Sequence, residues 1–536
     1  MAQNIKRRSL ARSTLQPSGR VSLWAAIVSA CLYWAAFPPV GLFPLAFVAL
    51  APLLNQAPGL KGWKRFLIGW FHFSLVHLMV FYWIVGTVQR MGGVGEGLSL
   101  LILLLYALFH GLMGGVFLWG LGRLGHDCGP LRFSLIAAGL FCLLEAIWPS
   151  VFPWYLGNAL YRSPILLQLA DLGGVHVLSF LMVFTAAYLA RRLPPHGPLD
   201  RGNLKRIAIT IGLVLSGILA YGGMRWVQYK PTSKGTIVRI GIVQPMIHAV
   251  DKMHASETTR QRILEQTWAQ HGLLPRDLDL IVWPEGGFPF FFQQSPSEKL
   301  PISHRATTRF VADIQRGATP LFVGALTQSP TEGQHNSAIL IDPDGSTQVY
   351  HKQRLVPFGE TLPLRSLVPG AQKRFRSLMR MRPGKGPGVF QIGEHRFIAQ
   401  ICYETIFPAG TRSDIRHTNP DFILNLTNDV WFGNTAALEL HLMAQAIRAV
   451  ETRRTLVRAT NTGISALVDP RGTISNRTPV FEATSQVFAF RPLIGDSPFL
   501  RFGNLFLYLI FALVVGLYFG PVVTTSIKTR LGRTKK

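Results

Sequence analysis

The sequence predicts an α-helical membrane bundle of about eight spans joined to a water-soluble α/β domain. Long apolar runs recur over residues 21–224, and another lies at 501–523. Hydrophobic residues make up 49% of the chain and charged residues only 15%, against about 25% charged residues in soluble domains. Between these runs, residues 225–500 alternate short β-rich segments with helix-like ones, which is the pattern of an α/β fold.

The membrane domain is predicted over residues 21–224, behind a basic tail at 1–20. Seven apolar runs of near-spanning length lie at 21–37, 42–54, 66–88, 97–122, 132–149, 165–190 and 207–224. The first two flank Pro38 and Pro39 and are expected to form a hairpin of two membrane helices. An eighth span at 501–523 precedes a second basic tail at 524–536.

The charge of the loops predicts the orientation of these spans. Lys and Arg are dense at both ends of the chain and in alternate loops, at 61–65 and 191–206. The loops between them hold at most one basic residue each, at 37–41, 89–97 and 149–164. The positive-inside rule therefore places both termini in the cytoplasm and residues 225–500 on the far side of the membrane.

Composition restricts the class of partner. The 536 residues include 54 Lys and Arg against 27 Asp and Glu, an excess that fits basic loops or attraction to anionic lipid headgroups. These residues are scattered between apolar runs with no nucleic-acid motif, so nucleic-acid binding is not expected. The chain has four cysteines, Cys31, Cys128, Cys142 and Cys402. They show neither Cys-x-x-Cys nor Cys/His metal spacing, so the sequence predicts neither a disulfide framework nor a metal site.

The soluble block at 225–500 predicts a mixed sheet. Segments of strand type lie at 236–244, 278–284, 320–327, 337–341, 397–401, 421–427, 455–459 and 464–468, and helix-like ones at 256–270, 302–315 and 438–453. The turn sequences Asp-Pro-Asp-Gly at 342–345 and Asp-Pro-Arg-Gly at 469–472 predict hairpins beside the alternating part. Residues 361–388, rich in Pro, Gly and Arg, are expected to form a long mobile loop next to the active site.

The strongest chemical signal is a cysteine at the end of a strand. Residues 397–404 read Phe-Ile-Ala-Gln-Ile-Cys-Tyr-Glu, an apolar run that ends at Cys402. A second run, Leu-Ile-Val-Trp-Pro-Glu, ends at Glu285, and a third segment places Lys352 ahead of a Pro/Gly turn and Glu360. A carboxylate can take the proton of a thiol, and a cation can stabilise the thiolate and later an oxyanion. The pattern predicts an activated-thiol site with Glu285 as base.

Each of these residues alone has a plainer interpretation. Cys402 could be a buried structural cysteine, Glu285 an acid at a helix N-terminus and Lys352 a surface cation. Glu360 could be a turn residue. Their joint occurrence in this order, at strand ends and in turns, favours the catalytic interpretation.

Six motifs carry a resemblance to a known family. They are Phe152-Pro-Trp-Tyr-Leu-Gly157, Trp283-Pro-Glu285, Leu355-Val-Pro-Phe-Gly-Glu360, Ile401-Cys-Tyr-Glu404, Asn428-Asp-Val-Trp-Phe-Gly433 and Arg458-Ala-Thr-Asn-Thr-Gly463. With the seven leading spans and the closing one, the chain resembles the nitrilase (carbon–nitrogen hydrolase) superfamily. Within it, the chain resembles the apolipoprotein N-acyltransferase family over nearly its whole length.

The resemblance implies a nitrilase-like αββα sandwich whose triad is Glu285 as proton acceptor, Lys352 as oxyanion stabiliser and Cys402 as nucleophile. Glu360 would be a second essential carboxylate that orients Lys352 or the incoming amine. The remaining residues implied by the motifs are Tyr403 and Glu404, which would shape the site, and Trp431 and Phe432, which would lie at its mouth or pack in the core.

The implied reaction is a ping-pong N-acylation without metal or cofactor, the last step of bacterial lipoprotein maturation. A phospholipid would donate the acyl group to Cys402, and the N-terminal diacylglyceryl-cysteine of an apolipoprotein would accept it. The protein would be a monomer in the bacterial inner membrane with a periplasmic catalytic domain. A membrane-tethered amidase with the same triad stays open as an alternative; the intact triad argues against a receptor or scaffold with an inactive nitrilase domain.

Five further positions bear on substrate access or on a cavity among the spans. Met253 stands where the family carries a tryptophan near the substrate, and Arg354 where it often has histidine. Phe290 belongs to an aromatic run at 288–292 that either dips into lipid or packs in the core. Glu145, inside a predicted span, is expected to line a cavity, because intramembrane carboxylates seldom face lipid. Asp171 is expected to do the same or to be interfacial.

Overall fold

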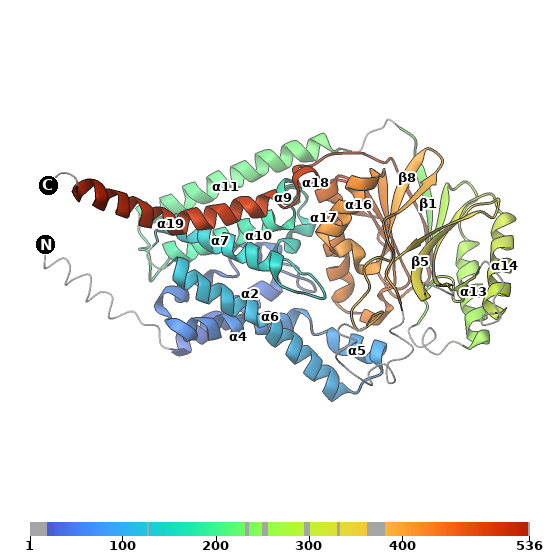
Figure 1. Cartoon of the computed structure of the whole chain (residues 1–536), viewed down its shortest axis with the longest axis horizontal. Coiled ribbons are helices and arrows are strands. Elements are labelled where there is room, and N and C mark those ends of the chain that lie inside the picture. Colours follow the sequence, from blue (N-terminus) through green and yellow to red (C-terminus); the bar gives the residue numbers. More distant parts are fainter. Residues whose placement is uncertain are drawn as a thin grey trace.

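A computed structural model of the chain describes residues 19–125, 128–230, 235–248, 256–293, 301–329, 333–361 and 381–533. It is elongated, with an apolar helical domain at one end and a two-sheet sandwich at the other (Figure 1). The helical domain is built from α2 (Gly19–Ala35), η1 (Phe43–Phe47), α3 (Ala51–Gln56), η2 (Ala57–Gly59), α4 (Gly62–Val80), α5 (Ile84–Gly92), α6 (Glu96–Leu124), α7 (Pro130–Ile147), η3 (Leu156–Arg162), α8 (Pro164–Leu167), α9 (Ala170–Gly173), α10 (Val175–Arg192) and α11 (Arg201–Gln228). After the sandwich, the chain returns along the helical domain as α18 (Pro498–Phe502) and α19 (Leu505–Arg533).

The helices long and apolar enough to cross a membrane, within the described ranges, are α6, α7, α10 and α11. The pair α4 and α5, bent by 59°, would be a fifth, and α2, α8–α9 and the described part of α19 are shorter apolar helices. This count does not confirm the eight predicted spans.

The predicted helical hairpin at 21–54 is wrong in its second half. Residues 42–54 form two short pieces, η1 and α3, instead of one helix. Pro44 and Pro52 each lie in the first turn of a new piece, where proline's missing N–H costs nothing, whereas inside a helix it removes a bond. The run at 165–190 is likewise divided, and Gly174, at φ +75°, separates α9 from α10.

The sandwich consists of a seven-stranded and a six-stranded mixed sheet in the described residues. The first has the order β13-β1-β2-β4-β5-β6, with β3 beside β4, and comprises β1 (Val238–Gln244), β2 (Leu280–Trp283), β3 (Phe291–Phe292), β4 (Leu321–Ser329), β5 (Gly333–Ile341), β6 (Thr347–His351) and β13 (Thr484–Phe490). The second has the order β12-β11-β10-β9-β8-β7 and comprises β7 (Gly388–Ile392), β8 (His395–Ile401), β9 (Phe422–Thr427), β10 (Thr455–Thr460), β11 (Ala466–Val468) and β12 (Ile474–Ser475).

The apolar faces of the two sheets meet in a continuous core. Phe322 of β4 and Phe397 of β8 have ring centroids 5.3 Å apart, and both side chains are fully buried. Helices α13 (Glu257–His271) and α14 (Pro301–Gln315) cover the outer face of the first sheet, and α16 (Pro408–Thr418) and α17 (Ala437–Thr452) cover the second (Figure 1). This αββα arrangement confirms the predicted nitrilase-like fold, including the parallel pairs β1–β2 and β8–β9 and the antiparallel hairpins at the two Asp-Pro turns.

The α16–α17 layer lies between the second sheet and the helical domain (Figure 1). Buried residues of α17 and of the helical domain belong to one hydrophobic cluster. Asp171 of α9, fully buried, accepts hydrogen bonds from Arg225 of α11 and from Arg453, which follows α17. Asp171 therefore joins the two domains through ion pairs, whereas Glu145 lines a cavity.

Candidate active site

Three strand ends bring the predicted triad to one edge of the sandwich. Glu285 follows β2, Lys352 follows β6 directly, and Cys402 follows β8. The turn that carries Glu285 lies against β4, because Gly324 has no side chain: a Cβ there would lie 2.6 Å from the Cα of Glu285. The close contact fixes the carboxylate relative to the sheet.

Lys352 is buried between two carboxylates. Its Nζ lies 2.9 Å from Glu360 Oε2, 3.0 Å from Glu360 Oε1 and 3.6 Å from Glu285 Oε1, and the side chain is 1% exposed. Burial alone would lower the pKa of Lys352, but Glu360, and then Glu285, outweigh it and raise that pKa well above its ordinary value. The ammonium therefore stays charged in the site.

Asn336 is a site residue that the sequence did not reveal. Its Nδ2 donates to Glu285 Oε1 and to Glu360 Oε1, both at 2.7 Å, and its backbone oxygen accepts from the Lys352 N–H at 2.8 Å. An asparagine just before the apolar segment at 337–341 gives no catalytic signal in the sequence. Its amide bridges the two carboxylates that flank Lys352.

Cys402 has a strained backbone and a thiol that stays protonated at rest. Its φ is +55°, in the left-handed region that few non-glycine residues adopt. Burial, with Glu285 next, raises the pKa of the Cys402 thiol, and Lys352 acts in the opposite direction. The thiol therefore needs a base to react, and Glu285 is the charged group with the largest effect on its pKa.

The carbonyl of Cys402 is held by two amides. Asn425 Nδ2 donates to it at 3.0 Å and Gln445 Nε2 at 3.2 Å. Both side chains are fully buried. These bonds stabilise the backbone conformation that turns the thiol out of the strand.

Gln445 is itself positioned by a buried ionic network. Arg458 donates to Gln445 Oε1 and, at 2.5 Å, to Asp429 Oδ2, and His441 contacts Asp429 Oδ1 at 2.9 Å. Burial would raise the pKa of Asp429, but Arg458 and His441 lower it below its ordinary value. Burial and Arg458 lower the pKa of His441, so its neutral ring donates to Asp429 and accepts from Gln445. The motifs at 428–433 and 458–463 thus meet beneath Cys402.

Glu404 connects the cysteine turn to the lysine turn. Its carboxylate accepts hydrogen bonds from the backbone N–H groups of Ile401, Gln353 and Arg354 at 2.6–3.0 Å. Tyr403 lies beside the lysine, with Lys352 Nζ 5.7 Å from the centre of its ring. Glu404 therefore links the turn at Cys402 to the backbone that follows Lys352.

The stability of the protein should reflect the buried carboxyl of Glu404. Burial raises its pKa from 4.5 to about 7. The folded protein then keeps a proton there that the unfolded chain loses, so stability should fall as pH rises from about 4.5 to about 7. We expect the melting temperature in detergent to fall less steeply over this range in Glu404→Gln than in wild type. Equal slopes in the two proteins would contradict this assignment.

Comparison with known proteins identifies the family. The family model "Carbon-nitrogen hydrolase" matches residues 239–488, and "Apolipoprotein N-acyltransferase N-terminal domain" matches residues 29–188. An apolipoprotein N-acyltransferase of Geobacter metallireducens is 30% identical over 494 residues, which are 90% of this chain and 91% of the relative. The chain belongs to the apolipoprotein N-acyltransferase family.

A second curated relative matches over a similar length of the chain. An apolipoprotein N-acyltransferase of Bdellovibrio bacteriovorus is 29% identical over 524 residues, 93% of each chain. Among solved structures, an amidase from Nesterenkonia sp. is 20% identical, with a TM-score of 0.35 over 52% of this chain and 97% of the amidase. The resemblance to the apolipoprotein N-acyltransferase family that the six motifs predicted is thereby confirmed.

The positions predicted to govern access in this N-acyltransferase lie in different surroundings. Phe290 is 4% exposed and packs with Phe288 and Phe310 behind the first sheet, so the core-packing alternative for this run is correct. Phe432 is 9% exposed, with its ring centroid 5.1 Å from that of Trp83 in the helical domain. Trp431 is partly exposed, and its backbone oxygen accepts from Arg90 Nε at 2.7 Å.

Two predicted features fall outside the described residues. Met253 and most of the predicted loop at 361–388, namely 362–380, are not among them. Arg354 is described, with its guanidinium 3.8 Å from the centre of the Phe407 ring. Within the described ranges, no group of three or more His, Cys, Asp or Glu side chains could hold a metal ion.

An apolar wall that includes Phe152 separates Cys402 from the interior of the helical domain. The ring of Phe152, in the loop before η3, lies 6.1 Å from that of Tyr403, beside Cys402. A cavity of about 50 Å³ opens there, and its lining includes Trp83, Phe152, Tyr403 and Phe432. The thiol of Cys402 is thus next to a surface that suits an alkyl chain.

Proposed function

We propose that this enzyme takes a fatty acyl group from a phospholipid and transfers it to the N-terminal amine of a diacylglyceryl-cysteine apolipoprotein. Membership in the apolipoprotein N-acyltransferase family supports the overall reaction. The observation that carries the assignment in this chain is the position of Cys402. It lies at the edge of the sandwich, in one apolar cluster with Tyr403 and with Phe152 of the helical domain. Hydrolysis of a small soluble amide needs no such wall, so the amidase alternative is not favoured.

In the first half-reaction, Glu285 takes the thiol proton and the Cys402 sulfur attacks an ester carbonyl of the phospholipid. The negative oxygen of the tetrahedral intermediate is stabilised by the Lys352 ammonium, which Glu360 and Asn336 hold in place. Collapse of the intermediate breaks the ester C–O bond. The departing glycerol oxygen takes the proton from Glu285, which leaves a thioester on Cys402 and a lysophospholipid.

In the second half-reaction, the α-amine of the lipoprotein attacks the thioester. Glu285 accepts a proton from the amine, Lys352 again stabilises the oxyanion, and the C–S bond breaks. The proton returns to sulfur, so that the thiol is restored and the lipoprotein carries an amide-linked acyl chain. No step uses a metal or a cofactor.

The acyl-enzyme is the test of this route. Protein incubated with phospholipid and no lipoprotein should gain the mass of one fatty acyl group, which neutral hydroxylamine removes from Cys402. Cys402→Ala should gain none, and Cys402→Ser should keep any adduct through the hydroxylamine treatment, because an oxygen ester resists it. An unmodified wild type that releases ammonia from a small amide would replace this function with that of an amidase.

We also propose that the protein is an inner-membrane monomer with a periplasmic sandwich and cytoplasmic ends. The loop charges support this orientation, and in Figure 1 α19 runs from the sandwich toward the far end of the helical domain. A reporter that is active only in the periplasm should be active when fused at Gly235 and inactive when fused after Lys536. A reporter that is active only in the cytoplasm should give the reverse result. The same location for both would overturn the orientation.

A further inference from the structure

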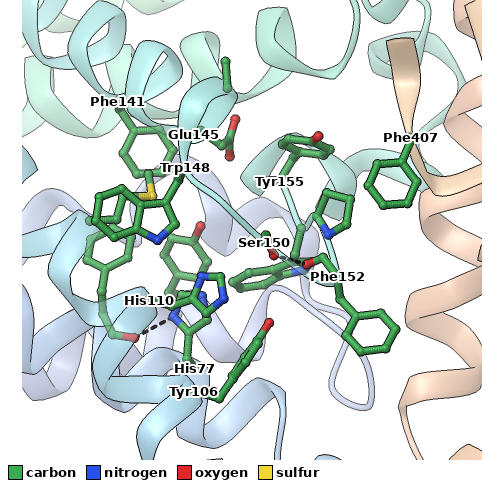
Figure 2. A pocket seen from close by; sticks show the side chains of 16 residues that line it. His77, Tyr106, His110, Phe141, Glu145, Trp148, Ser150, Phe152, Tyr155 and Phe407 are labelled. Carbon is green, nitrogen blue, oxygen red and sulfur yellow. Dashed lines mark hydrogen bonds between the residues drawn. The ribbon is translucent and has the colours of Figure 1, made fainter. Parts of the chain in front are cut away.

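A second cavity lies within the helical domain, behind the wall that Phe152 forms. It has a volume of about 190 Å³ and is enclosed by α2, α4, α6, α7 and the loop before η3. Figure 2 shows its lining, with the stacked rings of His77 and His110 on one side and Tyr155 on another. Phe407, from the start of α16 in the sandwich, also lines it. The cavity therefore ends where the two domains meet.

The lining of this cavity includes buried hydrogen-bond donors that have no acceptor partner among the described residues. The Nε1 atoms of Trp148 and Trp154 are buried and have no hydrogen-bond partner among the described residues. His77 donates from Nδ1 to the backbone oxygen of Phe73 at 2.7 Å, so a neutral ring there offers no second donor to the cavity. An indole N–H can only donate, and leaving a buried donor unsatisfied costs about 1–3 kcal/mol. Whatever fills the cavity must therefore offer oxygen acceptors.

The charge of the lining excludes an anionic group. Neither Lys nor Arg is among the lining residues. The carboxylate of Glu145 lies in the wall, where it already accepts from the Leu156 N–H at 2.7 Å and contacts His176 at 3.1 Å. A phosphate there would face a like charge with no cation to balance it. The fitting group is a neutral one with oxygen acceptors, surrounded by aromatic rings that suit the first carbons of alkyl chains.

The level of the cavity along the helices is the level at which the ester groups of a bilayer lie. His77 lies in the last turn of α4 and Trp148 directly follows α7, so both are at helix ends. Phe152 separates this cavity from Cys402: its side chain lines the cavity, and its ring also packs against Tyr403, next to Cys402. The ester groups of a bilayer lie between the headgroups and the chains, the level at which spanning helices end and Trp side chains gather.

We propose that this cavity binds the ester-linked glycerol backbone of a glycerolipid, whose carbonyl oxygens accept hydrogen bonds from Trp148 and Trp154. The proposal rests on the function given above, since both substrates of that reaction carry such a backbone. The donor is a phospholipid, and the acceptor carries a diacylglyceryl group. Bound here, the lipid would contact Phe152, whose ring also packs against Tyr403, the residue after Cys402.

Binding tests the site without turnover. Full-length Cys402→Ala protein in detergent is titrated with a diester phosphatidylglycerol and with its dialkyl ether analogue, which lacks the two carbonyls, and occupancy is followed by native mass spectrometry. We expect preference for the diester, reduced about tenfold by an added Trp148→Phe or Trp154→Phe, the equivalent of one lost hydrogen bond. Trp119→Phe, on the exposed side of α6, is the matched control and should keep it. The proposal would be overturned if the ester and the ether bound equally well, or if both cavity variants kept the full preference for the diester. Either result would mean that the two indoles bind only water.

Kinetics with Cys402 intact identifies which lipid binds. If the phospholipid occupies the cavity, Trp148→Phe raises the KM for acylation of Cys402. If the diacylglyceryl group does, the same change raises the KM for transfer from a preformed acyl-enzyme to a diacylglyceryl lipopeptide. Unchanged KM in both half-reactions would also overturn the proposal. A wild type that forms no acyl-enzyme would instead refute the proposed function, and the binding comparison would still decide the cavity.

Discussion

Lys352→Arg should form the Cys402 acyl-enzyme about a thousandfold more slowly than wild type, although the charge is kept. The ammonium of Lys352 fits as a point charge between Glu285 and Glu360, 1% exposed. A guanidinium is larger and planar, and it would pair with one carboxylate through its fork instead of pointing a single donor at the oxyanion. The bidentate pair would also draw Glu285 or Glu360 away from Asn336, which holds both.

The measurement is the rate of mass gain on Cys402 after mixing with phospholipid. Lys205→Arg, at an exposed position of α11, is the matched control and should acylate at the wild-type rate. The melting temperature of Lys352→Arg, taken in the same detergent, separates a catalytic loss from unfolding. A folded Lys352→Arg that acylates within tenfold of wild type would remove Lys352 from the role of oxyanion stabiliser.

The sequence predicted the strand ends of this site better than its supporting residues. Glu285 and Cys402 each follow a strand with a continuous apolar run, β2 and β8, and such runs record burial in a sheet in the local sequence. Lys352 follows β6, which reads Thr-Gln-Val-Tyr-His and carries a weaker strand signal. Asn336 could not be found in this way, because its role depends on two carboxylates that are 51 and 24 residues away in the chain. Long-range hydrogen bonds of a single polar side chain leave no local pattern.

The helical domain shows a different limit. Apolar runs were read as spans by length, but length does not indicate where a helix breaks. The run at 66–88 becomes α4 and α5 with a 59° bend, and the run at 42–54 is divided by prolines. The bend allows α5 to lie beside the Trp431 turn of the sandwich, where Arg90 donates to the Trp431 backbone oxygen. Contact with the other domain, which hydropathy does not encode, thus determines the path of the chain.

The position of Cys402 also depends on residues far from it in sequence. Its left-handed φ is retained because Asn425 and Gln445 hold its carbonyl, and Arg458 fixes the amide of Gln445. The motif at 458–463 was recognised in the sequence as a family feature only. The structure assigns Arg458 a physical role, as a buried cation whose charge is balanced by Asp429.

Glu360→Gln should block the first half-reaction, with acylation of Cys402 slowed by about a hundredfold or more. Two roles were open for Glu360, orienting Lys352 or accepting the proton of the incoming amine. Its oxygens lie 2.9 and 3.0 Å from Lys352 Nζ, and Oε2 also accepts from the Val356 N–H at 2.8 Å. A carboxylate bonded in this way is occupied with Lys352, which favours the orienting role.

The glutamine variant tests this choice because it keeps the shape of the side chain and removes its charge. Lys352 would then be a buried cation with Glu285 as its nearest remaining carboxylate, and it would move toward the base at the expense of the oxyanion. Glu394→Gln, at an exposed position of the turn between β7 and β8, is the control and should acylate normally. If folded Glu360→Gln instead accumulates the acyl-enzyme at the wild-type rate and fails only when lipopeptide is added, Glu360 acts on the amine and the orienting role is wrong.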